Sequence, residues 1–216
     1  MRSLFGDPHR IFGAVVHAWA LGNMRWGFHR CELEPHPPLP APAIVLANHQ
    51  HFFDIALVAS LLPPPLYFVA RREVGRVPLI GSVLRSGGHV FVHRGGGQGN
   101  DSALGDAVAR LNEGGRVLFF GEGTRSAVDE ILPLRSGALR LAARTGVPIV
   151  PLVIAGTRFT FPSGLWPIVP SRMAAAFLPP RTVNEVDARS TAYREALRAE
   201  MNAALVRIAP GTGSRI

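Results

Sequence analysis

The sequence contains no lysine, so all 23 of its basic side chains are arginines. A Walker-type phosphate loop requires a lysine, and Schiff-base catalysis requires a lysine amine, so both kinds of chemistry are excluded. With only 15 acidic residues, the chain carries a formal net charge of +8. That balance favours an anionic partner, which composition alone leaves open between nucleic acid, anionic lipid and an anionic substrate.

Cysteine is nearly absent as well, because Cys31 is the single thiol. An internal disulfide is impossible and a cysteine-based zinc site is disfavoured, so we expect a cytoplasmic protein with an ordinary packed or surface thiol. The 23 glycines form no G-x-G-x-x-G fingerprint, and no serine stands in a G-x-S-x-G elbow. These absences argue against a dinucleotide cofactor and against serine-hydrolase chemistry.

No apolar run reaches the length of about 20 residues that a membrane-spanning helix needs. The run Ile11–Leu21 is interrupted by His17 and is followed by the aromatic residues Trp26 and Phe28. We read residues 1–34 as an N-terminal amphipathic helical segment. Two placements stay open: an interfacial helix with its aromatic and arginine side chains at an anionic membrane surface, or a helix packed on the domain.

A proline-rich connector, residues 35–43, separates this segment from the main body, residues 44–216. In the main body, apolar runs of strand type alternate with helical patterns. The expected strands are residues 44–47, 66–70, 89–93, 116–120, 147–154 and 173–178, and the expected helices are residues 54–62, 78–85, 101–113, 136–145 and 190–208. The alternation predicts a single α/β domain, built on a mixed, mostly parallel sheet with helices on both faces.

A histidine and a carboxylate follow the first of these strands. His49 stands in the turn after the strand, and Asp54 begins the next helix. In that arrangement the carboxylate can accept one imidazole N–H, fix the tautomer and leave the other ring nitrogen to take a proton from a hydroxyl. The pattern predicts a general base and its orienting partner, without a protein nucleophile.

A second polar cluster, Gly121–Ser126, follows another predicted strand. Its glycines let the backbone approach a ligand closely, and the guanidinium of Arg125 can bind a phosphate through two hydrogen bonds. Arg94 follows a third strand, so two arginines are predicted to converge on an anion from two strand ends. Glu122 is expected to orient Arg125 or a substrate hydroxyl.

Together these segments resemble the glycerolipid acyltransferase family, typified by bacterial 1-acylglycerol-3-phosphate acyltransferase. The four blocks of the family are matched, in order, by Asn48–Asp54, Gly88–Arg94, Phe119–Ser126 and Val147–Gly156. The agreement of four separate blocks makes the resemblance specific. The chain departs from the family at three positions, where the family often has Ser, an Asp-like residue and Pro: His51, His93 and Gly121. These departures bear on the identity of the acceptor more than on the type of reaction.

The resemblance implies a glycerol-3-phosphate acyltransferase-like fold and an acyltransferase reaction. His49 would deprotonate the hydroxyl of a lysophospholipid such as 1-acylglycerol-3-phosphate, while Asp54 orients the imidazole. The hydroxyl would attack the thioester of acyl-CoA or acyl-carrier protein directly, without an acyl-enzyme, a cofactor or a metal. The residues implied in holding the acceptor are Arg94, Glu122, Gly123, Thr124 and Arg125, and Pro151 would shape the acyl-binding side.

The same resemblance implies a peripheral enzyme on the inner face of the cell membrane, in contact with anionic lipid. It also leads us to expect that backbone N–H groups near the His49 turn stabilise the oxyanion. Other readings stay open. His49, His51 and His93 could bind a metal together with Asp54. A basic membrane-binding or nucleic-acid-binding protein without catalysis is the alternative function, although the scattered arginines argue against nucleic acid.

Overall fold

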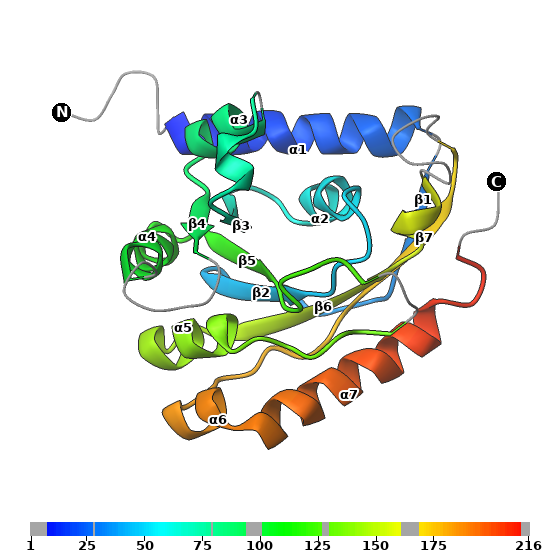
Figure 1. Cartoon of the computed structure of the whole chain (residues 1–216). Coiled ribbons are helices and arrows are strands. Elements are labelled where there is room, and N and C mark those ends of the chain that lie inside the picture. Colours follow the sequence, from blue (N-terminus) through cyan, green and yellow to red (C-terminus); the bar gives the residue numbers. More distant parts are fainter. Residues whose placement is uncertain are drawn as a thin grey trace.

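The structure, a computed structural model, describes residues 8–27, 29–78, 80–93, 101–126, 130–160 and 169–212. A seven-stranded sheet forms its centre, and helices cover both faces of the sheet (Figure 1). The strands are β1 (Arg30–Leu33), β2 (Ala43–Ala47), β3 (Leu66–Arg71), β4 (Val90–Val92), β5 (Arg116–Phe120), β6 (Ile149–Ala155) and β7 (Arg172–Phe177). The helices are α1 (Pro8–Trp26), α2 (Asp54–Leu61), α3 (Ile80–Ser86), α4 (Asp101–Asn112), α5 (Gly137–Thr145), α6 (Glu185–Arg189) and α7 (Thr191–Ile208), with short 3-10 helices η1 (Val74–Arg76) and η3 (Thr157–Thr160).

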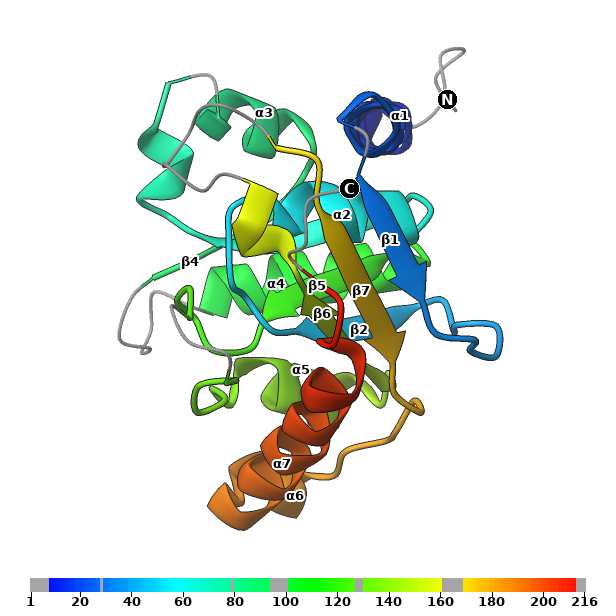
Figure 2. The same ribbon diagram turned by 90° about the vertical axis from the view of Figure 1, so that its right-hand side faces the viewer.

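The sheet is mixed and mostly parallel, which confirms the predicted fold class. Its strand order is β1-β7-β6-β2-β5-β3-β4. The strands from β6 to β4 pair in parallel, β7 is antiparallel to β6, and β1 is parallel to β7. Figure 2 shows β1 and β7 side by side at one end of the sheet. The carboxyl ends of five strands therefore share one edge, which is where open α/β sheets place their sites.

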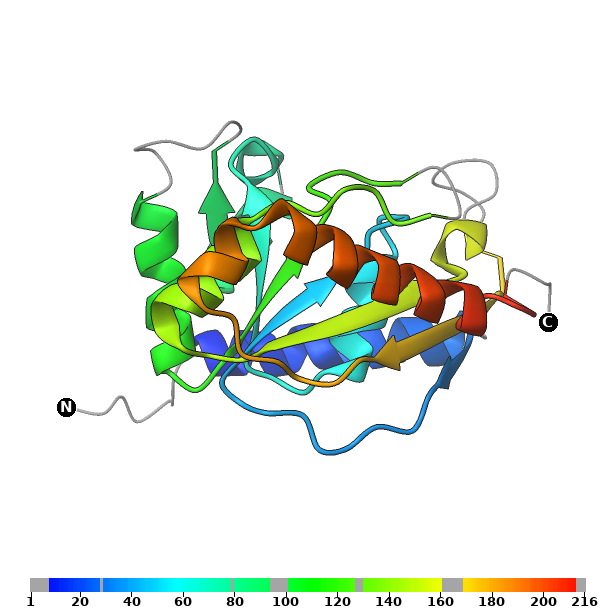
Figure 3. The same cartoon turned by 90° about the horizontal axis from the view of Figure 1, so that it is seen from below.

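Side-chain alternation along β2 divides the interior into two cores. Ile44 and Leu46 belong to the core formed with α4, α5 and α7, whereas Val45 belongs to the core formed with α1 and α2. All five residues of β2 are buried, because the strand lies in the middle of the sheet and is covered on both faces. Seen from below, α7 crosses one face while α1 lies behind the other (Figure 3).

Among the described elements, β1, α6 and the short 3-10 helices η1 and η3 were not predicted. The helical reading of residues 1–34 is corrected for Arg30–Leu33, which forms an edge strand paired with β7. Its four residues alternate polar and apolar in the sequence, but the run is short, and in the structure only Cys31 is half-buried while the other three are exposed. Burial raises the pKa of the Cys31 thiol to about 12, which agrees with a packed, unreactive cysteine.

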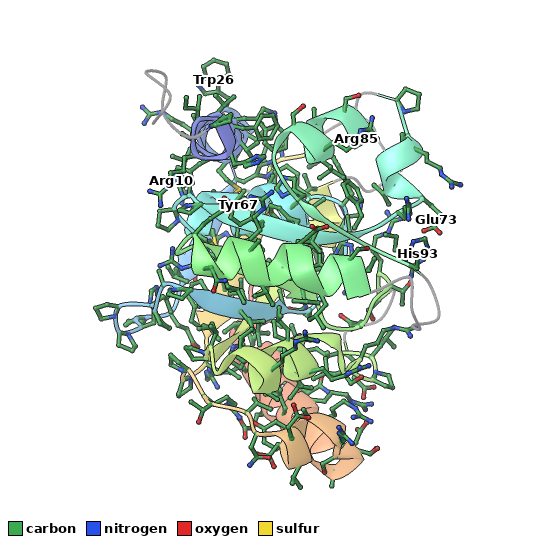
Figure 4. The ribbon with its side chains drawn as sticks, turned by 90° about the vertical axis from the view of Figure 1, so that its left-hand side faces the viewer. Arg10, Trp26, Tyr67, Glu73, Arg85 and His93 are labelled. Atoms are coloured by element: carbon green, nitrogen blue, oxygen red, sulfur yellow. The ribbon has the colours of Figure 1, made fainter. Side chains whose placement is uncertain are left out.

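Helix α1 is apolar on two sides. Its inner side, which includes Val16 and Ala20, packs in the core shared with α2. Its outer side carries exposed apolar residues at helical spacing: Ile11 (51% exposed), Val15 (61%), Trp19 (49%) and Trp26 (82%). Figure 4 shows Trp26 pointing away from the sheet. The helix is thus packed on the domain, in agreement with one of the two predicted placements. Its outer stripe stays exposed and is free of this packing, so it can contact a second surface.

Among the helices of the described ranges, none combines the length and the apolar character needed to cross a bilayer.

Candidate active site

The turn after β2 brings the predicted catalytic pair into contact. His49 Nδ1 lies 2.7 Å from Asp54 Oδ2, and the Asp54 side chain is fully buried. The same oxygen accepts the backbone N–H groups of Gln50 (2.7 Å) and His51 (2.9 Å). These donors hold the carboxylate so that it accepts the Nδ1–H of His49. Nε2 is then the ring nitrogen that can accept a proton.

The second oxygen of Asp54 is held by a residue that sequence reasoning missed. Thr157 Oγ1 donates a hydrogen bond to Asp54 Oδ1, and the threonine is also fully buried. Thr157 begins η3 just beyond the end of β6, and 103 positions separate the two residues in the chain. They meet because β6 pairs with β2. The available signal was the position of Thr157 shortly after a predicted strand.

Two further residues fix the place of the imidazole. The ring of His49 stacks on Phe120 at the end of β5, with centroids 3.9 Å apart and planes 16° apart. The buried Asn48 donates from Nδ2 to Ile154 O (2.9 Å) and accepts the N–H of Ile154 at Oδ1 (2.8 Å). The His49 turn is therefore attached to both strands that flank β2.

Glu122 braces this turn from the loop after β5. Its Oε1 accepts the backbone N–H of His49 (2.7 Å), and its Oε2 accepts the backbone N–H of Leu132 (3.0 Å). The N–H of Ser126 donates to the carbonyl of His49 (2.7 Å), so both backbone groups of His49 are held by one loop. Burial raises the pKa of Glu122 above its ordinary value, although the two N–H donors act in the opposite direction. Its predicted contact with substrate stays a prediction.

Three backbone amides of the His49 turn, where oxyanion donors are expected nearby, already have carboxylate acceptors. The amide of His49 is engaged by Glu122, and the amides of Gln50 and His51 are engaged by Asp54. A donor to the developing oxyanion near this turn would therefore be a different N–H group, and the expectation stays a prediction.

Two arginines outside the predicted set hold the loop that contains Gly123. Arg71, at the end of β3, donates to the carbonyl of Gly123, and Arg135 donates from Nε to the carbonyl of Glu122 (3.3 Å). Gly123 has a φ of +66°, and a Cβ there would lie 2.5 Å from Arg135 Nε, so the position requires glycine. Arg71 directly follows a predicted strand, so the strand-end argument could have identified it.

The other predicted binding residues lie in three different situations. Thr124 and Arg125 are exposed in the same loop, near the braced turn. Arg94 lies outside the described residues. Pro151 is buried in the middle of β6, paired with Leu46 and thus on the sheet face opposite Phe120. Its part in an acyl site stays a prediction, and its position favours a packing role.

The alternative metal site is not supported by the contacts of its members. His51 accepts the backbone N–H of Phe53 at Nδ1 (3.2 Å), and burial lowers the pKa of His51. His93, at the edge of the sheet after β4 (Figure 4), has its Nε2 2.6 Å from Arg72 Nη1. Within the part of the chain that the structure describes, no three His, Cys, Asp or Glu side chains are grouped to hold a metal ion.

Comparison with known proteins gives three findings. A family model described as acyltransferase matches residues 30–155. The 1-acyl-sn-glycerol-3-phosphate acyltransferase of Chlamydomonas reinhardtii is 36% identical over 59% of this chain and 38% of its own length, and the chloroplastic enzyme of that name from Arabidopsis thaliana is 31% identical over 74% and 46%. The chain thus spans about half the length of the curated relatives or less. The crystal structure of the 1-acyl-sn-glycerophosphate acyltransferase of Thermotoga maritima superposes with a TM-score of 0.68 at 26% identity, covering 90% of this chain and 77% of that one.

Proposed function

The chain belongs to the acyltransferase family, and from that premise we propose that it transfers a fatty acyl group to the free hydroxyl of a lysophospholipid such as 1-acylglycerol-3-phosphate. Its relatives, which are named as acyltransferases of 1-acyl-sn-glycerol-3-phosphate, support this acceptor. The observation that carries the proposal is the contact of 2.7 Å between His49 and Asp54 at the carboxyl end of β2. Thr157, after β6, donates a hydrogen bond to Asp54, and Glu122, after β5, accepts the backbone N–H of His49.

The reaction follows from the tautomer that Asp54 selects. His49 Nε2 takes the proton of the acceptor hydroxyl as the oxygen attacks the carbonyl carbon of the thioester, and Asp54 stabilises the imidazolium that forms. When the C–S bond breaks, the imidazolium returns the proton to the thiolate. The products are an ester and a free thiol, with His49 neutral again. No side chain is acylated, so acyl-CoA or acyl-carrier protein and the acceptor react in one ternary complex.

The acceptor phosphate is assigned to the exposed loop after β5. Arg125 and Thr124 are exposed there, and a guanidinium can bind a phosphate through two hydrogen bonds. Arg94 is assigned to the same phosphate on the family resemblance. In this proposal Glu122 positions the backbone of the site, because both of its oxygens accept hydrogen bonds from backbone amides.

We assign the outer stripe of α1 to a membrane surface, on the cytoplasmic face of the cell membrane. Trp19 and Trp26 are amphipathic side chains typical of the headgroup zone, and Arg25 in the last turn suits anionic lipid. Vesicle sedimentation tests this assignment. W19A/W26A should weaken binding to anionic vesicles by about tenfold or more. The matched control is V186A/V206A, which removes two residues that are 76% and 71% exposed on α6 and α7. Equal binding by the two variants would contradict the assignment.

The enzymatic proposal is tested by mass spectrometry of the lipids formed when the purified protein meets a panel of lysophospholipids with each acyl donor. We expect the turnover rate of H49A to be about 10²–10⁴-fold below that of the wild type, which is the range for removal of a general base, and we expect its fold to be intact. H36A is the control, because the ring of His36 packs on Phe177 on the far part of the sheet. Full activity in H49A would refute the mechanism. A wild-type protein that binds vesicles but transfers no acyl group would favour the non-catalytic alternative.

A further inference from the structure

A pocket lies on the face of the sheet opposite the His49–Asp54 pair. Its volume is about 530 Å³, within the usual range of roughly 300–1,000 Å³ for small-molecule sites. It is formed by α4, α5, α6 and the start of α7, and its lining residues are Leu104, Ser136, Arg140, Arg144, Glu185, Ala188, Arg189 and Arg194. We call it the arginine pocket.

Charge in the arginine pocket is not balanced. Four arginines face one acid, Glu185, which lies 3.6 Å from Arg189 in an exposed pair. Arg194 donates to Thr191 Oγ1 (2.9 Å), which is neutral. Within the described ranges, no carboxylate pairs with Arg140 or Arg144.

Arginines elsewhere on the same side of the molecule do have acidic partners. Arg181 pairs with Glu200 at 2.7 Å, and Arg198 pairs with Glu130 at 3.0 Å. Within the described ranges, Arg140 and Arg144 therefore differ from Arg181 and Arg198 on this side of the molecule in having no acidic partner. Arg140 and Arg144 are also four residues apart on α5, where like charges repel each other. An anion bound between them would remove this repulsion.

We propose that the arginine pocket binds a soluble organic phosphate that carries more than one phosphate group. The guanidinium fork matches phosphate oxygens in pairs, and arginines from three helices present more donors than a single phosphate group can use. Leu104 and Ala188 line the pocket with apolar side chains, which can contact the organic part of the ligand. A concave pocket of this size suits a small molecule better than the convex surface of an acidic protein.

The position of the pocket argues for a soluble ligand and against a lipid headgroup. Helices α5 and α6 lie at one end of the molecule and α1 lies at the other, with the sheet between them (Figures 1 and 4). If the outer stripe of α1 meets the bilayer, the arginine pocket faces the solvent. Two sources of the ligand share this chemistry: the phosphorylated nucleotide end of a coenzyme A thioester, or a separate soluble phosphate ester. The first source rests on the proposed function.

Calorimetric titration of the purified full chain with pyrophosphate, ADP and coenzyme A tests the proposal without requiring turnover. We expect saturable binding of at least one probe, weakened by about tenfold or more in R140A/R144A. The matched control is R30A/R172A, which removes the same charge from two exposed arginines paired across β1 and β7. Absence of saturable binding, or equal binding by R140A/R144A and the wild type, would overturn the proposal, as would an equal loss in the control.

Kinetics then separate the two sources. If the pocket holds the nucleotide end of the donor, R140A/R144A raises the KM for acyl-CoA and leaves the KM for an acyl-pantetheine unchanged. If the ligand is a separate phosphate ester, binding is weakened while both KM values stay at the wild-type level. Either result supports the pocket as a phosphate site. If the wild-type chain transferred no acyl group, the proposed function would be contradicted, but the titration would still show whether the arginine pocket binds phosphate.

Discussion

Replacing Thr157 by valine removes one hydroxyl and nearly preserves the shape of the side chain. That hydroxyl donates to Asp54 Oδ1, and both residues are fully buried, so water cannot take its place without rearrangement. A hydrogen bond to a charged group is worth about 1.5–3 kcal/mol. We expect the free energy of unfolding of T157V to fall by about this amount, measured by denaturant titration.

The effect on catalysis follows from the donors that remain. Asp54 Oδ2 keeps its contacts with His49 and with two backbone amides, so the catalytic pair should survive. One side of the carboxylate is released, and the imidazole it orients becomes less well placed. We expect kcat to fall by about tenfold to a hundredfold, which corresponds to about 1.4–2.7 kcal/mol in the barrier. KM should stay unchanged, because Thr157 is buried beneath the site and is assigned no contact with substrate.

Two control variants separate this role from simple packing. T157S keeps the hydroxyl and should retain most of the activity. T160V removes another fully buried hydroxyl of η3, whose partner is Ser171 Oγ at 3.2 Å, so it should lower stability with little change in kcat. A T157V variant with wild-type kcat, or a T160V variant with the same loss of kcat, would refute the reasoning.

Two further predictions concern acid stability and the acceptor. Burial lowers the pKa of His89 to about 4, and its Nδ1 accepts the N–H of Phe68 (3.0 Å), so the folded state holds His89 neutral. The free energy of unfolding is therefore unaffected by His89 above its unfolded pKa of about 6.5, and it falls by up to about 3 kcal/mol as the pH drops toward 4. Unfolding curves at pH 7 and pH 4.5 should show this loss, and the H89Q variant should show less of it. R125A should raise the KM for the lysophospholipid by about tenfold with a smaller change in kcat, and an unchanged KM would remove Arg125 from the acceptor site.

Local signals were sufficient for most of the fold. The run 116–120 is bounded by Gly114-Gly115 and Gly121, and it forms a strand over Arg116–Phe120 as predicted. The helix over Gly137–Thr145 ends at Gly146, whose φ of +69° is a left-handed conformation that glycine adopts easily. The position of His49 and Asp54 on either side of a turn was also readable, because five residues of chain already confine the pair.

Only the tertiary structure decided which distant residues complete the site. Thr157 reaches Asp54, and Glu122 reaches the backbone of His49, because strand pairing places the ends of β6 and β5 beside the end of β2. Periodicity within one segment carries no information about such pairing. The edge strand β1 was missed for the same reason: its four residues become a strand through hydrogen bonds with β7, whose sequence lies more than a hundred positions away. The sequence by itself thus determined most of the elements and the central pair, and the register of the sheet determined what surrounds them.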